Sequence, residues 1–266
     1  MSSRVCNASA PAAHVVVGPE TYSRWRETTL GAVTEALEHR LLHRLVSVIE
    51  GKRVLDLGCG DGLFTWTLAT RGARAVGIDI DRRMLRAAAA RATRARVPSR
   101  FVEGRVEHLP FRDGAFDVVV AVTVLCLVDD IDTAAREAVR VLRPGGRLVI
   151  GDLGRWSTWA AVRRVRGWLG APTWKRAHFS TAAELRALIE SLGVSVDIVR
   201  GSVYYPPVAA LARLMAPADH WLGALTTAGA AFIGVAGNKN GGVDRSSRTA
   251  LSQTASGLPP TADFEP

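Results

Sequence analysis

Residues 53–62 form the run Arg-Val-Leu-Asp-Leu-Gly-Cys-Gly-Asp-Gly, in which a short apolar segment ends in alternating glycines. The apolar part predicts a buried β-strand over 53–57. The glycines let the chain turn sharply after the strand, and they let a ligand lie against a backbone that carries no Cβ atoms. Because ligands of open α/β sheets sit at the carboxyl ends of the strands, this turn marks the first candidate ligand site.

Strand and helix patterns alternate on both sides of this turn. Apolar residues at helical spacing predict helices over 31–50, 63–70, 82–95 and 133–142. Strands are predicted between and after them, over 73–80, 101–103, 117–122 and 147–150. A capping box at Thr181 predicts a further helix that ends at Gly193, and two more strands follow at 194–200 and 230–236. This order indicates an open, mostly parallel sheet with helices on both faces.

A dinucleotide is the obvious alternative ligand for a glycine turn of this kind. Its fingerprint needs a glycine at position 63, where this chain has Leu63. Asp61 stands where a pyrophosphate would approach the helix, and its charge would repel phosphate. A sulfonium ligand that carries an ammonium group suits Asp56 and Asp61 better. Asp79 closes the next strand, and a carboxylate there can accept both hydroxyls of a ribose.

Five segments in order carry a family resemblance: Asp56-Leu57-Gly58-Cys59-Gly60-Asp61-Gly62, Gly77-Ile78-Asp79, Leu109-Pro110-Phe111, Phe116-Asp117-Val118-Val119 and Val141-Leu142-Arg143-Pro144-Gly145-Gly146. Their sequence and spacing resemble the class I S-adenosylmethionine-dependent methyltransferases, in the branch that includes the menaquinone and ubiquinone C-methyltransferases. The resemblance covers about residues 20–200.

This resemblance implies a Rossmann-like sheet of seven strands with the last strand antiparallel, and S-adenosylmethionine as the cofactor. The insert over 155–176 is expected to add a small helical cap. It also implies cofactor contacts at Asp56, Gly58, Cys59, Gly60, Asp79, Ile80, Arg105, Val106 and Val122. Arg105 departs from the family, which has Asp or Asn there for the adenine amino group. Because a guanidinium cannot accept that hydrogen bond, adenine recognition falls to the backbone around Val106 or to Glu107.

Two aromatic segments are candidates for covering the site. Tyr22-Ser23-Arg24-Trp25 resembles the N-terminal lid of the same branch, in which Tyr22 and Trp25 would place aromatic rings over the sulfonium. The alternative is that both rings pack the first helix.

The second segment is an insert over 155–176 that holds four of the seven tryptophans, including Trp156 and Trp159. A helix there would place apolar residues on one face and Arg163, Arg164 and Arg166 on the other. Trp159 and Arg163 are four residues apart and are expected to stack. Three interpretations of the insert stay open, namely a cap over a lipophilic acceptor, a scaffold element, and a peripheral contact with a membrane surface.

Methyl transfer from a sulfonium depends mainly on alignment, so the sequence need not contain a strong catalytic motif. A phenol, thiol or acidic carbon as acceptor would need a general base. The candidates are His178, Tyr204 and Tyr205, and no catalytic residue is assigned. Cys126 is expected to be a small buried residue, because no base adjoins it in the sequence.

The bulk composition limits the function further. The net charge of the 266 residues is +9, but the arginines are scattered. An Asn/Asp-Pro-Pro-Tyr element is absent after the strand at 117–122, so we expect a small-molecule acceptor and no nucleic acid. The alternatives are an RNA methyltransferase and a non-catalytic adenosylmethionine-binding protein.

The sequence also indicates the cellular location and the domain organisation. The three cysteines fit neither a disulfide framework nor a metal site. With no signal peptide and no membrane span, we expect a cytoplasmic protein. We predict a flexible tail over 1–18, a methyltransferase domain over 19–237 with its cofactor half at 52–152, and a disordered tail over 238–266.

Overall fold

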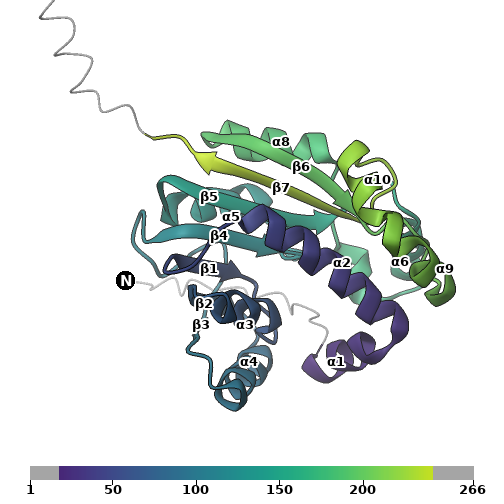
Figure 1. The fold of residues 1–266 in the computed structure, drawn as a ribbon, viewed down its shortest axis with the longest axis horizontal. Helices are drawn as coiled ribbons and strands as arrows, with labels where there is room; N and C mark the ends of the chain where they lie inside the picture. Colours follow the sequence, from purple (N-terminus) through teal and green to yellow (C-terminus); the bar gives the residue numbers. More distant parts are fainter. Residues whose placement is uncertain (1–17, 242–266) are drawn as a thin grey trace, which may run out of the picture.

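One sheet of seven strands organises the computed structural model, which describes residues 18–241 (Figure 1). The strands lie in the order β3-β2-β1-β4-β5-β7-β6. Their bounds are β1 Arg53–Leu57, β2 Arg74–Asp79, β3 Arg100–Glu103, β4 Phe116–Val122, β5 Leu142–Leu153, β6 Val194–Ser202 and β7 Phe232–Lys239.

Within the described sheet, β7 is the one strand whose direction is opposite to that of the other six. It pairs antiparallel with both β5 and β6, while β1 pairs parallel with β2 and β4. The expected antiparallel last strand is therefore confirmed. The strand order reverses at β1 and β4, whose carboxyl ends lie together at one edge of the sheet. Ligands of open α/β sheets bind at such an edge.

Helices cover both faces of the sheet (Figure 1). Their bounds are α1 Pro19–Glu27, α2 Thr29–Val46, α3 Leu63–Thr70, α4 Arg82–Ala95, α5 Ile131–Val141, α6 Thr158–Trp168, α7 Pro172–Arg176, α8 Ala182–Ser191, α9 Ala209–Met215 and α10 Asp219–Leu225, with short 3-10 turns η1 Leu125–Leu127 and η2 Ala216–Ala218. Side-chain caps explain several of their starts. Asp81 accepts from the backbone N–H of Arg83 at 2.8 Å, and Thr181 and Glu184 form the predicted capping box.

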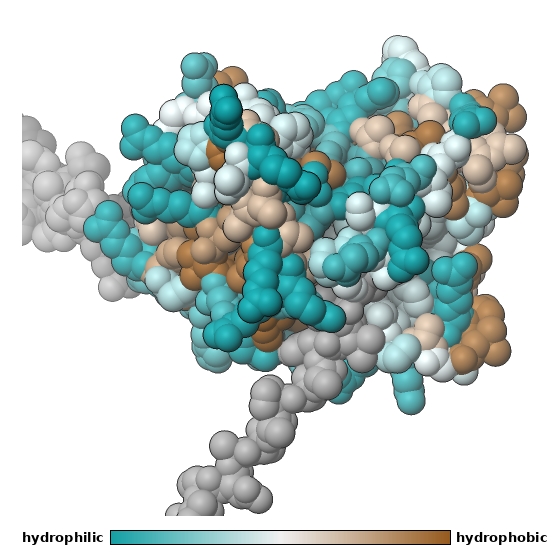
Figure 2. Space-filling model, turned by 90° about the horizontal axis from the view of Figure 1, so that it is seen from below, coloured by the Kyte–Doolittle hydropathy of each residue, from teal (hydrophilic) through white to brown (hydrophobic). Residues whose placement is uncertain are grey.

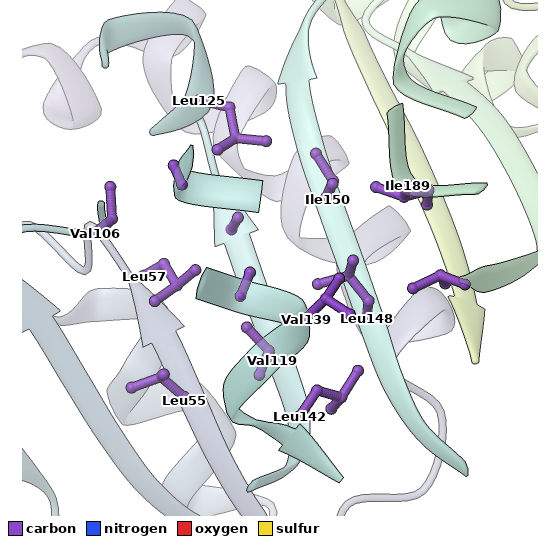
Figure 3. Packing of buried hydrophobic residues seen from close by; sticks show 14 of the residues in the cluster. Leu55, Leu57, Val106, Val119, Leu125, Val139, Leu142, Leu148, Ile150 and Ile189 are labelled. Atoms are coloured by element: carbon purple, nitrogen blue, oxygen red, sulfur yellow. The ribbon is translucent and has the colours of Figure 1, made fainter. Parts of the chain in front are cut away.

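Each face of the sheet has its own apolar core. On one face, Val119, Leu148 and Ile150 of the central strands pack with α5 and α8 (Figure 3). On the other, Val120 and Val149 pack against α2, α3 and Trp159 of α6. The strands are therefore buried on both faces, as their nearly continuous apolar sequences require.

The structure differs from the predicted elements at several places. The helix predicted over 31–50 begins at Thr29 and ends at Val46, where Ser47 takes a positive φ of 60°. A separate helix, α1, precedes it. No helix was predicted over 203–229, yet α9 and α10 form there. Strand β7 includes Asn238 and Lys239, which the sequence analysis assigned to the C-terminal tail. The rest of both predicted tails lies outside the described residues, apart from 18 and 240–241.

The turn after β6 depends on one buried carboxylate. Asp219 of α10 is 3% exposed and accepts from the Ser202 hydroxyl at 2.6 Å and from the backbone N–H groups of Val203 and Tyr204 at 2.8 and 3.2 Å. Val203 has a φ of 64°, which is unfavourable for a β-branched residue. The carboxylate therefore holds a strained turn that leads the chain beneath α2.

Replacing Asp219 with Ala should destabilise the protein strongly, because it leaves several buried donors without an acceptor. We expect the free energy of unfolding to fall by roughly 3 kcal/mol, which corresponds to about 10 °C in the melting temperature. Asp129→Ala, which removes an exposed carboxylate, is the matched control. Equal melting temperatures for the two variants in thermal unfolding would contradict this role.

Candidate functional site

The turn between β1 and α3 exposes backbone at the carboxyl edge of the sheet. Gly58, Gly60 and Gly62 have φ values of 62°, 55° and 72°, a region that glycine occupies without strain. A Cβ on Gly58 would come within 2.4 Å of the Val124 side chain, whereas a Cβ on Gly60 would meet no described atom within 4 Å. Gly58 is therefore required by packing, and Gly60 faces open space.

Asp79, at the end of β2, is bonded to this turn. One carboxylate oxygen accepts from the backbone N–H of Gly60 at 2.8 Å, and the other accepts from the N–H of Asp81 at 2.8 Å. Burial raises the pKa of Asp79 despite these bonds. Ile80 follows at the edge with its side chain 39% exposed. The carboxyl end of β2 thus lies directly beside the glycine turn.

Asp56 lies inside the protein, beneath the turn. It is 2% exposed and accepts a 2.6 Å hydrogen bond from the Thr65 hydroxyl of α3. Burial raises the pKa of Asp56 to about 7. Cys59, also buried, has its thiol pKa raised by burial. Both side chains support the turn from within.

Asp61 has a different environment from the one expected. Its carboxylate, 7% exposed, forms ion pairs with Arg26 of α1 and, at 2.7 Å, with Arg91 of α4. Burial alone would raise the pKa of Asp61, but the hydrogen bonds and charges of the two arginines lower it below its usual range. The expectation that Asp61 suits a ligand ammonium is therefore corrected, because two guanidinium groups already neutralise it.

The segment after β3 contains Arg105, the residue that departs from the family pattern. The Arg105 guanidinium donates to Glu107 at 3.0 Å, and Glu107 and Val106 are both buried. Val122 ends β4 partly buried, and the next residue, Thr123, has a φ of 48°. Non-glycine residues with such backbone angles concentrate at functional sites.

Arg163 of α6 points inward. Its guanidinium carbon lies 5.1 Å from the Trp159 ring centroid and 4.9 Å from that of Trp174. The predicted stacking of Trp159 on Arg163 is confirmed. The arginines that were predicted to share one face of the helix differ in their surroundings, because Arg166 is exposed whereas Arg163 is half-buried against the two aromatic rings. The helix pattern could not reveal this, because Trp174 comes from α7 and completes the aromatic pair only in the fold.

Among charged groups, Glu38 of α2 has the largest electrostatic effect on Arg163. Burial raises the pKa of Glu38 to about 7, and the charge of Arg163 partly opposes that rise. Burial lowers the pKa of Arg163, with Glu38 and Cys126 acting against it. Within residues 18–241, neither Glu38 nor Arg163 has a hydrogen-bond or ion-pair partner. Glu38 gave no signal in the sequence, because it lies at an ordinary polar position of an amphipathic helix.

A buried pair at the ends of β4 and β5 lies near Arg163. Cys126 and Asp152 are each 1% exposed, and burial raises the pKa of the Asp152 carboxyl to about 6. Oδ1 of Asp152 has no hydrogen-bond partner among the described residues. Cys126 is buried, as expected, but it adjoins a carboxyl group that the sequence did not indicate.

The three residues that the sequence offered as general bases lie in different environments. His178 is exposed, and the Tyr204 hydroxyl donates to the carbonyl of Thr226. The Tyr205 hydroxyl is buried and lies 2.9 Å from the Thr34 hydroxyl. Both tyrosine hydroxyls are therefore engaged in structural hydrogen bonds.

The candidate lid and cap residues separate into packed and exposed side chains. The Tyr22 and Trp25 rings lie 5.6 Å apart in α1. Trp159 is 7% exposed and donates from Nε1 to the Tyr205 carbonyl at 2.9 Å, whereas Trp156 is 72% exposed. Trp159 is therefore part of the core that positions Arg163, and Trp156 is a surface residue.

Residues 18–241 contain neither a candidate metal cluster nor a helix that could span a membrane. No group of three His, Cys, Asp or Glu side chains lies close enough to hold a metal ion. No helix in this part of the chain is both long and apolar enough to cross a bilayer.

Comparison with known proteins gives consistent matches. The family described as "Methyltransferase domain" matches residues 55–150. An uncharacterised protein of Mycobacterium tuberculosis is 34% identical over 200 residues, which are 75% of this chain and 65% of that protein. The ubiquinone biosynthesis O-methyltransferase of Azorhizobium caulinodans is 32% identical over 184 residues, 66% of this chain and 73% of that protein.

The sheet order is also that of solved methyltransferases. The structure of an S-adenosylmethionine-dependent methyltransferase from Thermotoga maritima superimposes with a TM-score of 0.63 at 23% identity, covering 83% of this chain and 96% of that one. The fold is therefore the Rossmann-like fold of class I methyltransferases. This chain belongs to the family of S-adenosylmethionine-dependent methyltransferases, whose cofactor is S-adenosylmethionine. It spans slightly less than two thirds of the mycobacterial relative's length.

Removing the guanidinium of Arg26 should release α1 from the glycine turn. Arg26→Met removes charge-assisted hydrogen bonds worth about 1.5–3 kcal/mol each, so local opening of 19–27 should increase about tenfold or more. Hydrogen-exchange mass spectrometry measures this, and Arg24→Met, at an exposed position of the same helix, is the control. Unchanged protection of 19–27 in Arg26→Met would show that the ion pair does not hold the helix.

Proposed function

We propose that this protein transfers the methyl group of S-adenosylmethionine to a small, lipophilic acceptor with a hydroxylated aromatic ring. The proposal depends on one observation: two sites of different chemistry lie toward the same edge of the sheet. The open glycine turn beside Asp79 suits a nucleoside, and Glu38 with Arg163 suits an ionisable hydroxyl. The Azorhizobium relative, a ubiquinone biosynthesis O-methyltransferase, supports this acceptor class.

The residues at the edge fit the cofactor. We assign the ribose hydroxyls to Asp79 and the backbone approach to Gly58, Cys59 and Gly60, because a Cβ at Gly60 would enter the open space. Further contacts are assigned to Ile80, Arg105, Val106 and Val122, and Asp56, buried and bonded to Thr65, is assigned to the support of the glycine turn. Because Arg105 is paired with Glu107, adenine contacts fall to the Val106 backbone or to Glu107. When bound, the cofactor supplies a methyl group activated by its sulfonium.

Glu38 and Arg163 would act on the acceptor. With its pKa raised to about 7, Glu38 holds a carboxylate basic enough to take the proton of a phenolic hydroxyl. Arg163, held by Trp159 and Trp174, would stabilise the oxyanion that results. We propose Glu38 as the base in place of His178, Tyr204 and Tyr205, since both tyrosine hydroxyls are engaged elsewhere.

Several finer assignments rest on this proposal. We place the chain in the branch of the menaquinone and ubiquinone methyltransferases, and we place the enzyme in the cytoplasm, where the free thiols of Cys59 and Cys126 would stay reduced. The methyltransferase domain is proposed to cover 19–237, with Tyr22 and Trp25 of α1 above the cofactor. An RNA methyltransferase and a non-catalytic binder are the alternatives.

Asp79→Ala should weaken cofactor binding by about tenfold or more, because it removes charge-assisted hydrogen bonds to the ribose. Isothermal calorimetry with S-adenosylhomocysteine measures this directly. Asp81→Ala removes the same charge two residues away, where Asp81 caps α4 and pairs with Arg83, and should keep the affinity within about twofold. Equal affinities of Asp79→Ala and the unmodified protein would remove Asp79 from the cofactor site.

Glu38→Gln should abolish the pH dependence of methyl transfer. Since the base must be unprotonated, turnover of the unmodified protein should rise as the pH increases through about 7. The variant should lose about a hundredfold in turnover above that pH, with unchanged cofactor affinity. The measurement uses radiolabelled S-adenosylmethionine and cell extract separated into small-molecule and nucleic-acid fractions.

The outcomes of this assay separate the three functions. Label should enter the small-molecule fraction, and Glu50→Gln, at an exposed position by the amino ends of the strands, should match the unmodified protein. Label in the nucleic-acid fraction would favour the RNA methyltransferase. Binding of cofactor without label in either fraction would favour the non-catalytic protein. Full turnover in Glu38→Gln would show that another group accepts the proton.

A further inference from the structure

Most of the exposed large apolar side chains lie in two stretches of the chain, 156–169 and 208–225. The residues are Trp156, Val162, Val165, Trp168, Leu169, Val208, Leu211, Leu214, Trp221 and Leu225. Scattered single exposed apolar residues are ordinary, but a concentration of them marks an interaction surface. We call these two stretches the apolar end.

The two stretches are adjacent in the fold. Trp159 of α6 donates a 2.9 Å hydrogen bond to the carbonyl of Tyr205, which leads into α9, and both residues belong to one core cluster with Ala212. Figure 1 shows α6, α9 and α10 together at one end of the molecule, and Figure 2 shows hydrophobic groups projecting at that end. The surface therefore comes from three helices of one end.

The degree of exposure at this end is high. Trp168 is 83% exposed, Leu169 is 82% exposed and Leu225 is 84% exposed, so these side chains have almost no contact with the rest of the described protein. Leaving such side chains in water forgoes the hydrophobic stabilisation that burial would provide. A partner that removes them from water would recover it.

The charge at this end has one sign. The exposed charged residues of α6, α7, α9 and α10 are all basic, and they include Arg166, Lys175, Arg176 and Arg213. The only carboxylate in these helices is Asp219, which is 3% exposed and bonded to the turn after β6. The apolar end is therefore cationic, with no exposed carboxylate on these helices.

A hollow between α6 and α7 has the same two components. Trp168, Trp174 and Phe179 line it with aromatic rings, and Arg164 and Lys175 add cations. Tryptophan side chains that carry both apolar surface and a polar N–H are enriched at membrane–water interfaces. The hollow thus combines a place for apolar chains with donors for an anionic group.

We propose that the apolar end docks on the surface of an anionic lipid bilayer. The tryptophans and leucines would enter the boundary between headgroups and acyl chains, and the basic residues would contact lipid phosphates. A nucleic acid would satisfy the cations but leave leucines such as Leu214 and Leu225 in water. A second copy would place one cationic surface against another.

This docking would serve a lipophilic acceptor, because α6 presents Arg163 to the proposed acceptor site and Trp168 to the outside. The inference nevertheless stands on the surface alone and requires no methyl transfer. A vesicle assay therefore tests it separately from the proposed function, since binding and turnover are measured independently.

The test is co-sedimentation of the full chain with vesicles of phosphatidylcholine, with and without phosphatidylglycerol. We expect binding only to the phosphatidylglycerol vesicles, with affinity falling about tenfold between low and high salt because screening weakens electrostatic attraction. The double variant Trp168→Ser and Leu169→Ser should lose about tenfold in affinity. Val48→Ser should not, because Val48, 70% exposed, lies beside the amino ends of the strands.

A double charge-reversal variant tests whether the basic residues contribute to vesicle binding. Arg166→Glu with Lys175→Glu should abolish binding, whereas Arg44→Glu should leave it unchanged; Arg44 lies in the last turn of α2 as Arg166 does in α6. Circular dichroism spectra and melting temperatures confirm that the variants fold.

Several results would overturn the proposal. The chain would bind no vesicles at low salt or at high salt. Alternatively, the Trp168→Ser and Leu169→Ser variant would bind vesicles as tightly as the unmodified protein. If those two substitutions instead dissociate a dimer seen in sedimentation velocity, the apolar end is an interface between two copies. If the chain binds an oligonucleotide and ignores vesicles, the surface recognises nucleic acid.

Discussion

The positive φ angles of Gly58, Gly60 and Gly62 are the constraint on which the arrangement of the site depends. They reverse the chain between β1 and α3 within a few residues, and they bring the N–H of Gly60 to Asp79 at 2.8 Å. The same turn directs the buried carboxylate of Asp61 to Arg26 and Arg91. One short turn therefore connects β1, β2, α1 and α4 at the edge where strand order reverses.

The proposed acceptor site depends on packing between distant segments. Arg163 is half-buried, and its guanidinium lies against the rings of Trp159, which is bonded to the carbonyl of Tyr205, and of Trp174. Burying a cation without a bonded anion is costly, and Glu38 offsets part of that cost from a distance.

The sequence predicts several elements of the fold well, because their signals are local. The apolar run over 53–57 and the glycines after it are enough for β1 and its turn, and the capping box at Thr181 is enough for the start of α8. The proposed acceptor site depends on tertiary contacts that leave little local trace in the sequence. Arg163 has the pattern of a solvated face, Glu38 that of an ordinary helix surface, and Asp61 meets Arg26 only after α1 folds back.

A crystal structure of the complex with S-adenosylhomocysteine would show whether the glycine turn and Asp79 hold the cofactor. We expect the ribose hydroxyls within hydrogen-bond distance of the Asp79 carboxylate, the ligand against the backbone of Gly58 and Gly60, and the sulfur on the side of Glu38 and Arg163. A ligand bound away from the glycine turn would overturn this assignment. So would a sulfur that faces away from Glu38 and Arg163.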